Sequence, residues 1–263
     1  MKTGLILVVL SASLAAGCMM QTAVSQDRPA VAPTTPDPKP RSVVLVELFP
    51  SEGCSSCPPA DRALKFLADQ QPVPNAEIIP LAFHVDYWNN LGWKDKFSSP
   101  TYSRRQELYV SRFGLGSSYT PEMVVDGRAE FIGNDTGTAA KKISQAAADQ
   151  KGTITATLSG DTVNVSIHNL PEHHPSTVFL AFAEDSLNSE IKGGENGGQT
   201  MVHSSVVRSL STLGLIEKGT SSIEMKGTVP VIADTKPENS RLVLFVQDNV
   251  SRRILAVGYI KAA

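Results

Sequence analysis

The first half of the chain alternates short apolar runs with amphipathic segments. Val43 to Phe49 (VVLVELF) is β-branched and apolar, which predicts a buried strand. Pro58 to Gln70 has the spacing of an amphipathic helix, and Ser99-Pro100 is typical of the start of another. An Asp126-Gly127 pair between apolar runs predicts a hairpin turn. In chain order the pattern is βαβαββα, with elements at 43–49, 58–70, 77–85, 99–113, 123–126, 129–132 and 139–150.

From Gly152 onward, polar and apolar residues alternate with period two and helical signals are scarce. Thr153 to Leu158 and Thr162 to His168 alternate across a Gly160-Asp161 turn, which predicts a hairpin. The predicted fold class is an α/β domain over residues 42–150, followed by a β-rich antiparallel, sandwich-like domain over residues 151–263. Further strands of the second domain are predicted at 178–183, 221–229, 242–247 and 254–260.

The N-terminal residues have the pattern of an export signal. Lys2 supplies a positive charge, an apolar run follows, and Ala15-Ala16-Gly17-Cys18 resembles the end of a bacterial lipobox. We therefore predict a signal peptide over residues 1–18, lipidation of Cys18 and a Pro-rich tether over residues 19–41. The product would be a periplasmic lipoprotein anchored to a bacterial membrane. The alternative is ordinary cleavage after Ser25, which would release a soluble periplasmic or secreted protein.

The charge balance gives no reason to expect nucleic acid as a partner. The 263-residue chain has 24 Lys and Arg against 26 Asp and Glu, which is a net charge of −2. It has 3 cysteines, so lipidation of Cys18 would leave only Cys54 and Cys57. In an oxidising compartment these two either form one local disulfide or are kept reduced by a partner.

Cys54-Ser55-Ser56-Cys57 is the strongest candidate for chemistry. The motif follows a predicted strand and opens a predicted helix, where unpaired backbone N–H groups and the helix dipole favour a thiolate on Cys54. Cys57, three residues on, is placed to resolve a mixed disulfide. The alternatives are a structural pair or half of a zinc site, although 3 cysteines exclude a four-cysteine zinc site. We predict no bound metal and no organic cofactor beyond a redox-active Cys54–Cys57 disulfide.

Tyr119-Thr120-Pro121 enters an apolar run about sixty residues after the CxxC motif. Together the two motifs resemble the thioredoxin superfamily over roughly residues 41–150. A closer resemblance is to a domain-of-unknown-function family of secreted bacterial proteins with a thioredoxin-like fold. It is carried by ELFPSEGCSSCPPAD (47–61), HVDYWNNLGW (84–93), the 119–127 segment and GGENGGQTMVHSSVVR (193–208).

The resemblance implies roles for several further residues. The Thr120–Pro121 bond would be cis and would face the CxxC, and the Thr120 backbone would pair with a substrate strand. Independently of the resemblance, Trp88 follows the predicted strand at 77–85, where we expect it to contact a protein substrate. Glu47 lies on the buried face of the first strand, where a carboxylate costs several kcal/mol unless it is neutral or paired. It would relay the proton of Cys57, or else be a salt-bridged structural glutamate.

Two other clusters have competing interpretations. His84 and Asp86 would bind copper with the two thiols if the protein delivered metal, although the simpler interpretation is a hydrogen-bonded loop. The glycine-rich segment 193–198 lacks the features of a phosphate loop. For this segment we expect a Glu195–Arg208 pair that organises the loop, with a ligand or interdomain site as the alternative.

These observations predict an exported thioredoxin-like enzyme, a thiol–disulfide oxidoreductase acting on envelope proteins. Its partners would be protein thiols or disulfides and an upstream electron donor, with membrane contact only through the lipid anchor. The alternative is a module for metal (copper) delivery, or for protein binding and assembly, on a thioredoxin-like scaffold. A scaffold that keeps the CxxC only as a local disulfide is the third hypothesis.

Overall fold

Strand β1 (Ser42–Phe49) lies inside a large mixed sheet rather than in a sheet of its own domain. In the computed structural model, which describes Met1 and residues 41–261, β1 pairs in parallel with β2 (Ala76–Ala82) and antiparallel with β3 (Glu122–Val125). Over the described residues this sheet has 8 strands in the order β13-β12-β7-β10-β2-β1-β3-β4. Its remaining strands are β4 (Ala129–Ile132), β7 (Ser176–Glu184), β10 (Val206–Ile216), β12 (Ser240–Asp248) and β13 (Ile254–Lys261).

Helices cover both faces of the β1 region. Helix α1 (Cys57–Gln70) and α3 (Thr136–Ala146) pack on the face that carries Val44, Val46 and Leu48. Helix α2 (Pro100–Phe113) packs on the opposite face, where Tyr102 and Tyr109 join Leu45 and Phe49. Alternation of side chains along β1 explains why neighbouring residues belong to different cores.

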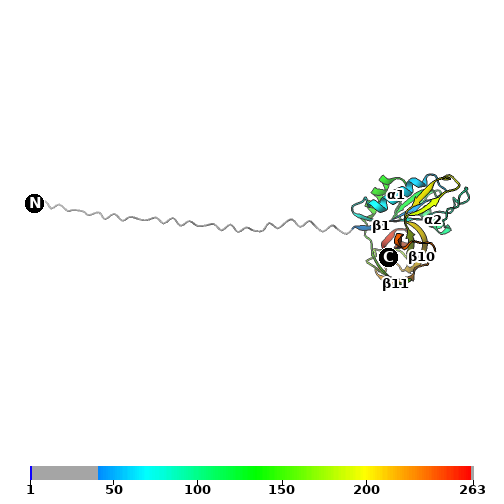
Figure 1. Ribbon diagram of the computed structural model, residues 1–263. Helices are drawn as coiled ribbons and strands as arrows, with labels where there is room; N and C mark the ends of the chain where they lie inside the picture. Colours follow the sequence, from blue (N-terminus) through cyan, green and yellow to red (C-terminus); the bar gives the residue numbers. More distant parts are fainter. Residues whose placement is uncertain (2–40, 262–263) are drawn as a thin grey trace. The chain divides into compact units, whose positions relative to one another are not determined.

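A smaller sheet completes the fold at the far end of the large one. Its order is β11-β6-β5, and its strands are β5 (Thr153–Ser159), β6 (Thr162–His168) and β11 (Ile223–Thr228). The buried residues of β6 pack against Leu242, Leu244 and Val246 of β12. A hairpin of β8 (Leu187–Glu190) and β9 (Thr200–His203), and a 3₁₀ turn at Pro237–Asn239, complete the described elements. Figure 1 shows α1 and α2 near one end of this unit and β11 at the other.

The expected fold class is wrong. Residues 41–261 belong to one compact unit that is mostly β-sheet, instead of a βαβαββα thioredoxin-like domain followed by a separate antiparallel sandwich. The reason lies at β2, whose second edge pairs in parallel with β10 at Ala82 and Val206. The Ala82 N–H donates to the Ser205 carbonyl at 2.7 Å. Because β10 pairs with β2, the strands β7, β12 and β13 belong to the same sheet as β1.

Many individual elements are nevertheless where the periodicity predicts them, within a few residues. The strands β8, β9 and β10 were not predicted from the sequence. In β10 the apolar residues are interrupted by Arg208 and Ser209, and its pairing with β7 is shifted at two irregularities. A shifted register breaks the period-two alternation on which strand prediction depends.

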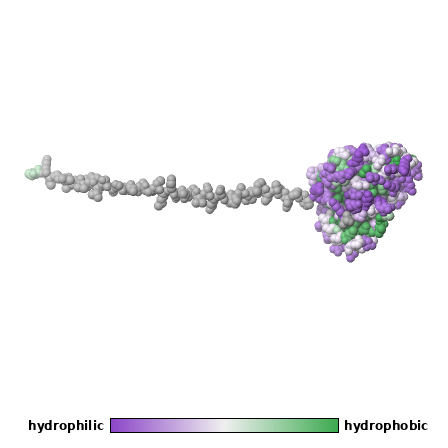
Figure 2. Space-filling view, viewed as in Figure 1, coloured by the Kyte–Doolittle hydropathy of each residue, from purple (hydrophilic) through white to green (hydrophobic). Residues whose placement is uncertain are grey.

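The surface differs between the two ends of the compact unit. Figure 2 shows a largely hydrophilic surface over the helix-bearing part and a hydrophobic area toward the other end. None of the helices in residues 41–261 combines the length and the hydrophobicity of a membrane-spanning segment. The predicted signal peptide, the tether and the lipidation site Cys18 lie outside the described residues.

Candidate functional site

The CxxC motif lies in the turn between β1 and α1. Helix α1 begins at Cys57, with Pro58 and Pro59 in its first turn. Proline is tolerated there because the first N–H groups of a helix have no intrahelical partner and its φ angle suits the helix. The two prolines therefore start the helix rather than distort it. The N–H of Cys57 donates to the carbonyl of Cys54 at 3.2 Å, which closes the turn.

The two cysteines are a thiol pair in this structure and not a disulfide. The Cys57 thiol donates to the Cys54 sulfur, with the Sγ atoms 2.6 Å apart. The Ser56 hydroxyl lies 3.2 Å from the same Cys54 sulfur. Both residues are buried, since Cys54 is 1% exposed and Cys57 0%. The two sulfurs are therefore joined by a single S–H···S hydrogen bond in a buried site.

Their surroundings give the two thiols opposite acidities. The hydrogen bond from Cys57, helped by Ser56 and only partly opposed by burial, lowers the pKa of Cys54 to about 6. Burial, together with the hydrogen bond to Cys54, raises the pKa of Cys57 above its usual range. These shifts favour a thiolate on Cys54 and a thiol on Cys57 at neutral pH, while the roles of the two as nucleophile and resolving cysteine stay a prediction.

The Thr120–Pro121 step lies beside the cysteine pair. Its peptide bond is cis, as predicted. The Ser56 hydroxyl also lies 3.5 Å from the Thr120 carbonyl, so the turn and the step are in contact. Trp88 lies against the other side of the turn, because a Cβ at Gly53 would come within 3.3 Å of Trp88 Cβ. The three predicted substrate-binding residues are thus brought to the CxxC, and their role with a substrate stays a prediction.

Glu47 is held away from this turn by a buried ion pair. Its carboxylate accepts from Arg105 Nε at 2.6 Å and from the Tyr109 hydroxyl. Gln247 of β12 contacts both partners, at 3.1 Å from Arg105 Nη1 and 2.8 Å from the Tyr109 hydroxyl. These contacts are those of a salt-bridged structural glutamate. The predicted proton relay from Cys57 to Glu47 stays a prediction, because the hydrogen bonds described for the Glu47 carboxylate go to Arg105 and Tyr109.

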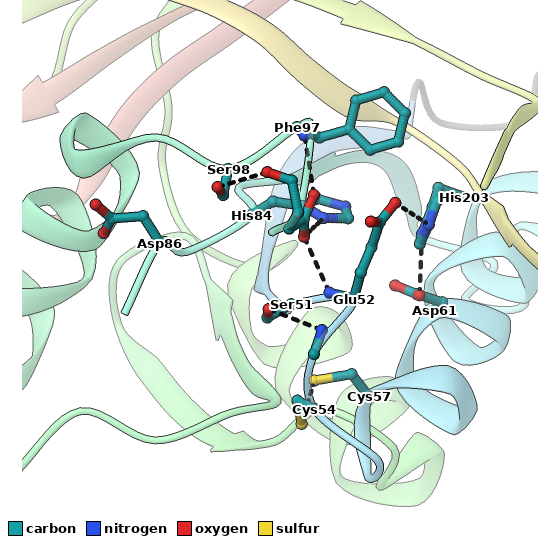
Figure 3. Close-up of polar contacts among 12 residues, drawn as sticks. Ser51, Glu52, Cys54, Cys57, Asp61, His84, Asp86, Phe97, Ser98 and His203 are labelled. Carbon is teal, nitrogen blue, oxygen red and sulfur yellow. Dashed lines mark hydrogen bonds and ion pairs between the residues drawn. The ribbon is translucent and has the colours of Figure 1, made fainter. Parts of the chain in front are cut away.

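A buried group of charged side chains lies on the other side of Cys57 (Figure 3). His203 Nδ1 is 3.2 Å from Asp61 Oδ2, and His203 Nε2 is 3.4 Å from Glu52 Oε1. Burial alone would lower the pKa of His203, but these two carboxylates outweigh it and raise the pKa to about 9. The imidazole is therefore a buried cation between two carboxylates at neutral pH. Asp61 and His203 lie in segments that carry the family resemblance, but no local pattern marks either one as a member of a charged cluster.

A second histidine joins this group through Asp95. His84 Nδ1 is 2.7 Å from Asp95 Oδ2, which also accepts the Glu52 N–H at 2.9 Å. The rings of His84 and His203 meet edge to face at 4.9 Å. In residues 41–261 and Met1, no three His, Cys, Asp or Glu side chains are arranged to hold a metal ion. These contacts are those of a hydrogen-bonded loop, the simpler of the two interpretations of the His84 segment.

The segment Gly193 to Gly198 lies over the CxxC turn. Glu195 accepts from the Ser55 N–H at 3.0 Å and from the Ser55 hydroxyl at 2.7 Å. Asn196 is buried and donates to the carbonyls of Glu52 at 2.8 Å and Cys54 at 2.9 Å. The predicted Glu195–Arg208 pair is wrong, because Arg208 pairs with Glu184. Only a glycine fits at position 193, since a Cβ there would collide with the carbonyl of Gly92.

A further buried carboxylate follows the cis proline. Glu122 accepts from Gln106 at 2.7 Å, and Gln106 in turn accepts from the Tyr87 hydroxyl at 3.1 Å. Burial raises the pKa of Glu122 to about 7, which the hydrogen bond from Gln106 only partly opposes. Glu122, directly after the cis proline, is therefore a buried group that titrates near neutral pH.

A family model described as "Protein of unknown function (DUF1223)" matches residues 45–247, which is more than half of the chain. The chain belongs to this family. The predicted resemblance to a domain-of-unknown-function family is confirmed, but the match names neither an activity nor the thioredoxin superfamily. The site residues from Glu47 to His203 all lie within the matched segment.

Solved structures extend the likeness to the fold. The crystal structure of a protein from Agrobacterium tumefaciens is 26% identical and has a TM-score of 0.68, over 85% of this chain and 96% of that chain. A domain of the outer membrane lipoprotein Omp28 from Porphyromonas gingivalis is 16% identical over 43% of this chain and 88% of that chain. The TM-score of this second comparison is 0.23. Comparison with curated proteins yields no significant match.

Proposed function

We propose that this protein is an exported thiol–disulfide oxidoreductase that acts on envelope proteins through Cys54 and Cys57. The observation that carries the proposal is the unequal acidity of the two thiols: the pKa of Cys54 falls to about 6 and that of Cys57 rises. An exchange catalyst needs a thiolate that attacks first and a neighbouring thiol that stays protonated until its turn.

The reaction takes place in two displacement steps. In the reducing direction, the Cys54 thiolate attacks a substrate disulfide, whose S–S bond breaks as a mixed disulfide forms with Cys54. The departing substrate thiolate takes up a proton. Cys57 then loses its proton and attacks the Cys54 sulfur, which closes the Cys54–Cys57 disulfide and releases the second substrate thiol. Two electrons pass to the substrate, and a reducing partner restores the dithiol; the oxidising direction reverses these steps.

The surroundings of Cys54 suit an extended substrate. Thr120 places its backbone carbonyl beside Ser56, and Trp88 lies at the other side of the turn. We propose a similarity to the thioredoxin superfamily for this site only and not for the whole fold. It is supported by the combination of a CxxC at the start of a helix with a Thr-Pro step that faces it. The proposal needs no organic cofactor, because the cysteine pair itself carries the electrons.

The proposed location is the bacterial envelope. It depends on the export signal and the lipobox-like Ala15-Ala16-Gly17-Cys18 of the sequence. Lipidation of Cys18 would tether the compact unit through the Pro-rich residues 19–41. Envelope proteins with cysteines would then be the substrates and a membrane or periplasmic thiol donor the electron source.

The reduction potential of the Cys54–Cys57 pair tests the proposal. A thiolate stabilised in the reduced state makes a pair more oxidising, so we expect a value between about −270 mV and about −120 mV. Equilibration against glutathione, with alkylation as the readout, gives the value. A pair that never equilibrates with small thiols would contradict the proposed activity. Cys57→Ser should trap the mixed disulfide on Cys54, which checks the order of the two steps.

A further inference from the structure

The resolving cysteine lies one helical turn from a charged cluster that the two displacement steps leave without a role. We call Glu52, Asp61 and His203 the buried charge cluster; they are 0%, 7% and 1% exposed. Removing charged groups from water is costly, so buried charges such as these need partners of opposite charge. Glu52 Oε1 and His203 Nε2 make no regular hydrogen bond, and each faces the other at 3.4 Å as an ion pair. Strongly perturbed buried charges beside a reactive group are typical of functional sites.

Asp61 is the member of the cluster that shares helix α1 with Cys57 and whose charge acts on it. Both residues are in α1, at positions i and i+4, so their side chains lie on the same face of the helix. Figure 3 shows Asp61 above Cys57 and turned toward Glu52 and His203. The negative charge of Asp61 contributes, after burial and the Cys54 hydrogen bond, to the raised pKa of Cys57. The carboxylate and the thiol are therefore electrostatically coupled.

Asp61 also connects the cluster to solvent. A cavity of about 220 Å³ beside α1 is lined by Asp61 together with Pro58, Arg62 and residues 199–202. Glu52 and His203 do not line this cavity, and His203 holds one Asp61 oxygen at 3.2 Å. A proton that reaches Asp61 from the buried side can therefore leave through the cavity.

We propose that Asp61 accepts the proton of Cys57 in the second displacement step, and that His203, held by Glu52, positions the Asp61 carboxylate. This inference rests on the proposed oxidoreductase function. Cys57 transfers its proton to Asp61, the resulting thiolate attacks the Cys54 sulfur of the mixed disulfide, and the substrate thiolate leaves. That thiolate is protonated from Asp61 or from cavity water, so protons and electrons balance.

The experiment follows the two steps separately with glutathione disulfide as the probe. The reduced full chain is mixed with the probe, quenched with acid at intervals and analysed by peptide mass spectrometry, which distinguishes glutathionylated Cys54 from the Cys54–Cys57 disulfide. In Asp61→Asn we expect Cys54 to be glutathionylated at close to the wild-type rate. We expect resolution to slow by about 100-fold or more, so that the adduct accumulates.

Two further variants separate proton transfer from structure. Asp61→Glu should restore resolution in part, because it keeps a carboxylate at the same helical position. Asp69→Asn is the matched control, since Asp69 lies in the same helix with an exposed side chain paired to Lys65. Its resolution rate should equal that of the wild type. If Asp61→Asn does not fold, His203→Gln provides the second test, with slower resolution expected again.

The outcomes distinguish the two proposals. If wild-type Cys54 forms no glutathione adduct at all, the proposed oxidoreductase function fails. If the adduct forms and Asp61→Asn resolves it at the wild-type rate, only the role of Asp61 is overturned. Equal slowing of both steps, with no rescue by glutamate, would also overturn it in favour of a purely structural role.

Discussion

The acidity of Cys54 depends on two short contacts rather than on the helix alone. Ser56 provides no side-chain cap to α1, and its hydroxyl lies instead 3.2 Å from the Cys54 sulfur. A donor aimed at a thiolate favours the charged form and so lowers the pKa of the cysteine. Ser56 therefore contributes to the low pKa of Cys54, whereas the Ser55 hydroxyl donates to Glu195 instead.

Replacing Ser56 with alanine should raise the pKa of Cys54. In the wild type, the rate of alkylation by iodoacetamide should rise with pH to a midpoint at about 6, because the thiolate is the reactive form. In Ser56→Ala the midpoint should move toward the value of a free cysteine, about 8.5. Ser55→Ala is the matched control and should keep the wild-type midpoint. An unchanged midpoint in Ser56→Ala would show that its hydroxyl does not stabilise the thiolate.

At this scale the sequence predicts the reacting residues but not their partners. Cys54, Cys57 and the cis Thr120–Pro121 step are recognisable because they belong to short local motifs. Asp61 is the exception, since its i, i+4 spacing from Cys57 was available in the sequence as a signal. The position of His203 could not be predicted in this way. It lies 142 residues after Asp61, and no local pattern indicates which carboxylates it will contact.

The segment Gly193 to Gly198 acts as a clamp on the turn between β1 and α1. Asn196 satisfies the carbonyls of Glu52 and Cys54, and Glu195 satisfies the N–H of Ser55. Backbone groups of a buried turn need such partners, because an unsatisfied group costs about 1–3 kcal/mol. The clamp therefore both orders the motif and limits access to Cys54.

Asn196→Ala should loosen the clamp without touching either cysteine. Two buried carbonyls would lose their donor, so we expect the free energy of unfolding to fall by about 1–3 kcal/mol. Alkylation of Cys54 at a fixed pH should become several-fold faster, because the turn opens more often. Urea denaturation and alkylation kinetics measure the two effects. Asn188→Ala, at an exposed position in β8, is the control and should change neither; a stable variant with unchanged alkylation would argue against the clamp.

At the scale of elements, periodicity predicts what is locally regular. The first strand, the three helices and the β3–β4 hairpin have clear caps, turns or alternation, and the structure confirms them. The clamp consists of glycines and polar residues, and the two strands of the β8–β9 hairpin beside it are only 4 residues long each. Their conformation is set by contacts with the CxxC turn, so no local pattern could reveal it.

A buried arginine joins the two halves of the chain. Arg105 of α2 pairs with Glu47 of β1 and contacts Gln247 of β12. Its guanidinium also lies 5.3 Å from the ring centroid of Phe179 and 5.1 Å from that of Phe245, on β7 and β12. Strands β1, β7 and β12 of the large sheet are thus tied to one buried cation.

Arg105→Met should destabilise the whole molecule. It would leave the Glu47 carboxylate buried without a cation, which typically costs about 3–5 kcal/mol. Thermal unfolding, followed by circular dichroism, should show a lower melting temperature. The double variant Arg105→Met with Glu47→Gln should recover part of the loss, because the unpaired charge is gone. Arg104→Met, which changes the exposed neighbour, is the control; a loss as large there would contradict the role of the buried pair.

The sequence by itself determined the local motifs of this protein: the CxxC at a helix start, the Thr-Pro step and most regular elements. These depend on interactions between residues close in the chain. Only the tertiary structure decided that β10 joins β2 and that one large sheet replaces two domains, because strand pairing depends on edges far apart in sequence. It also decided that His203 and Asn196 lie beside the cysteine turn and helix α1. Buried charges and backbone groups there find their partners only once the strands have assembled.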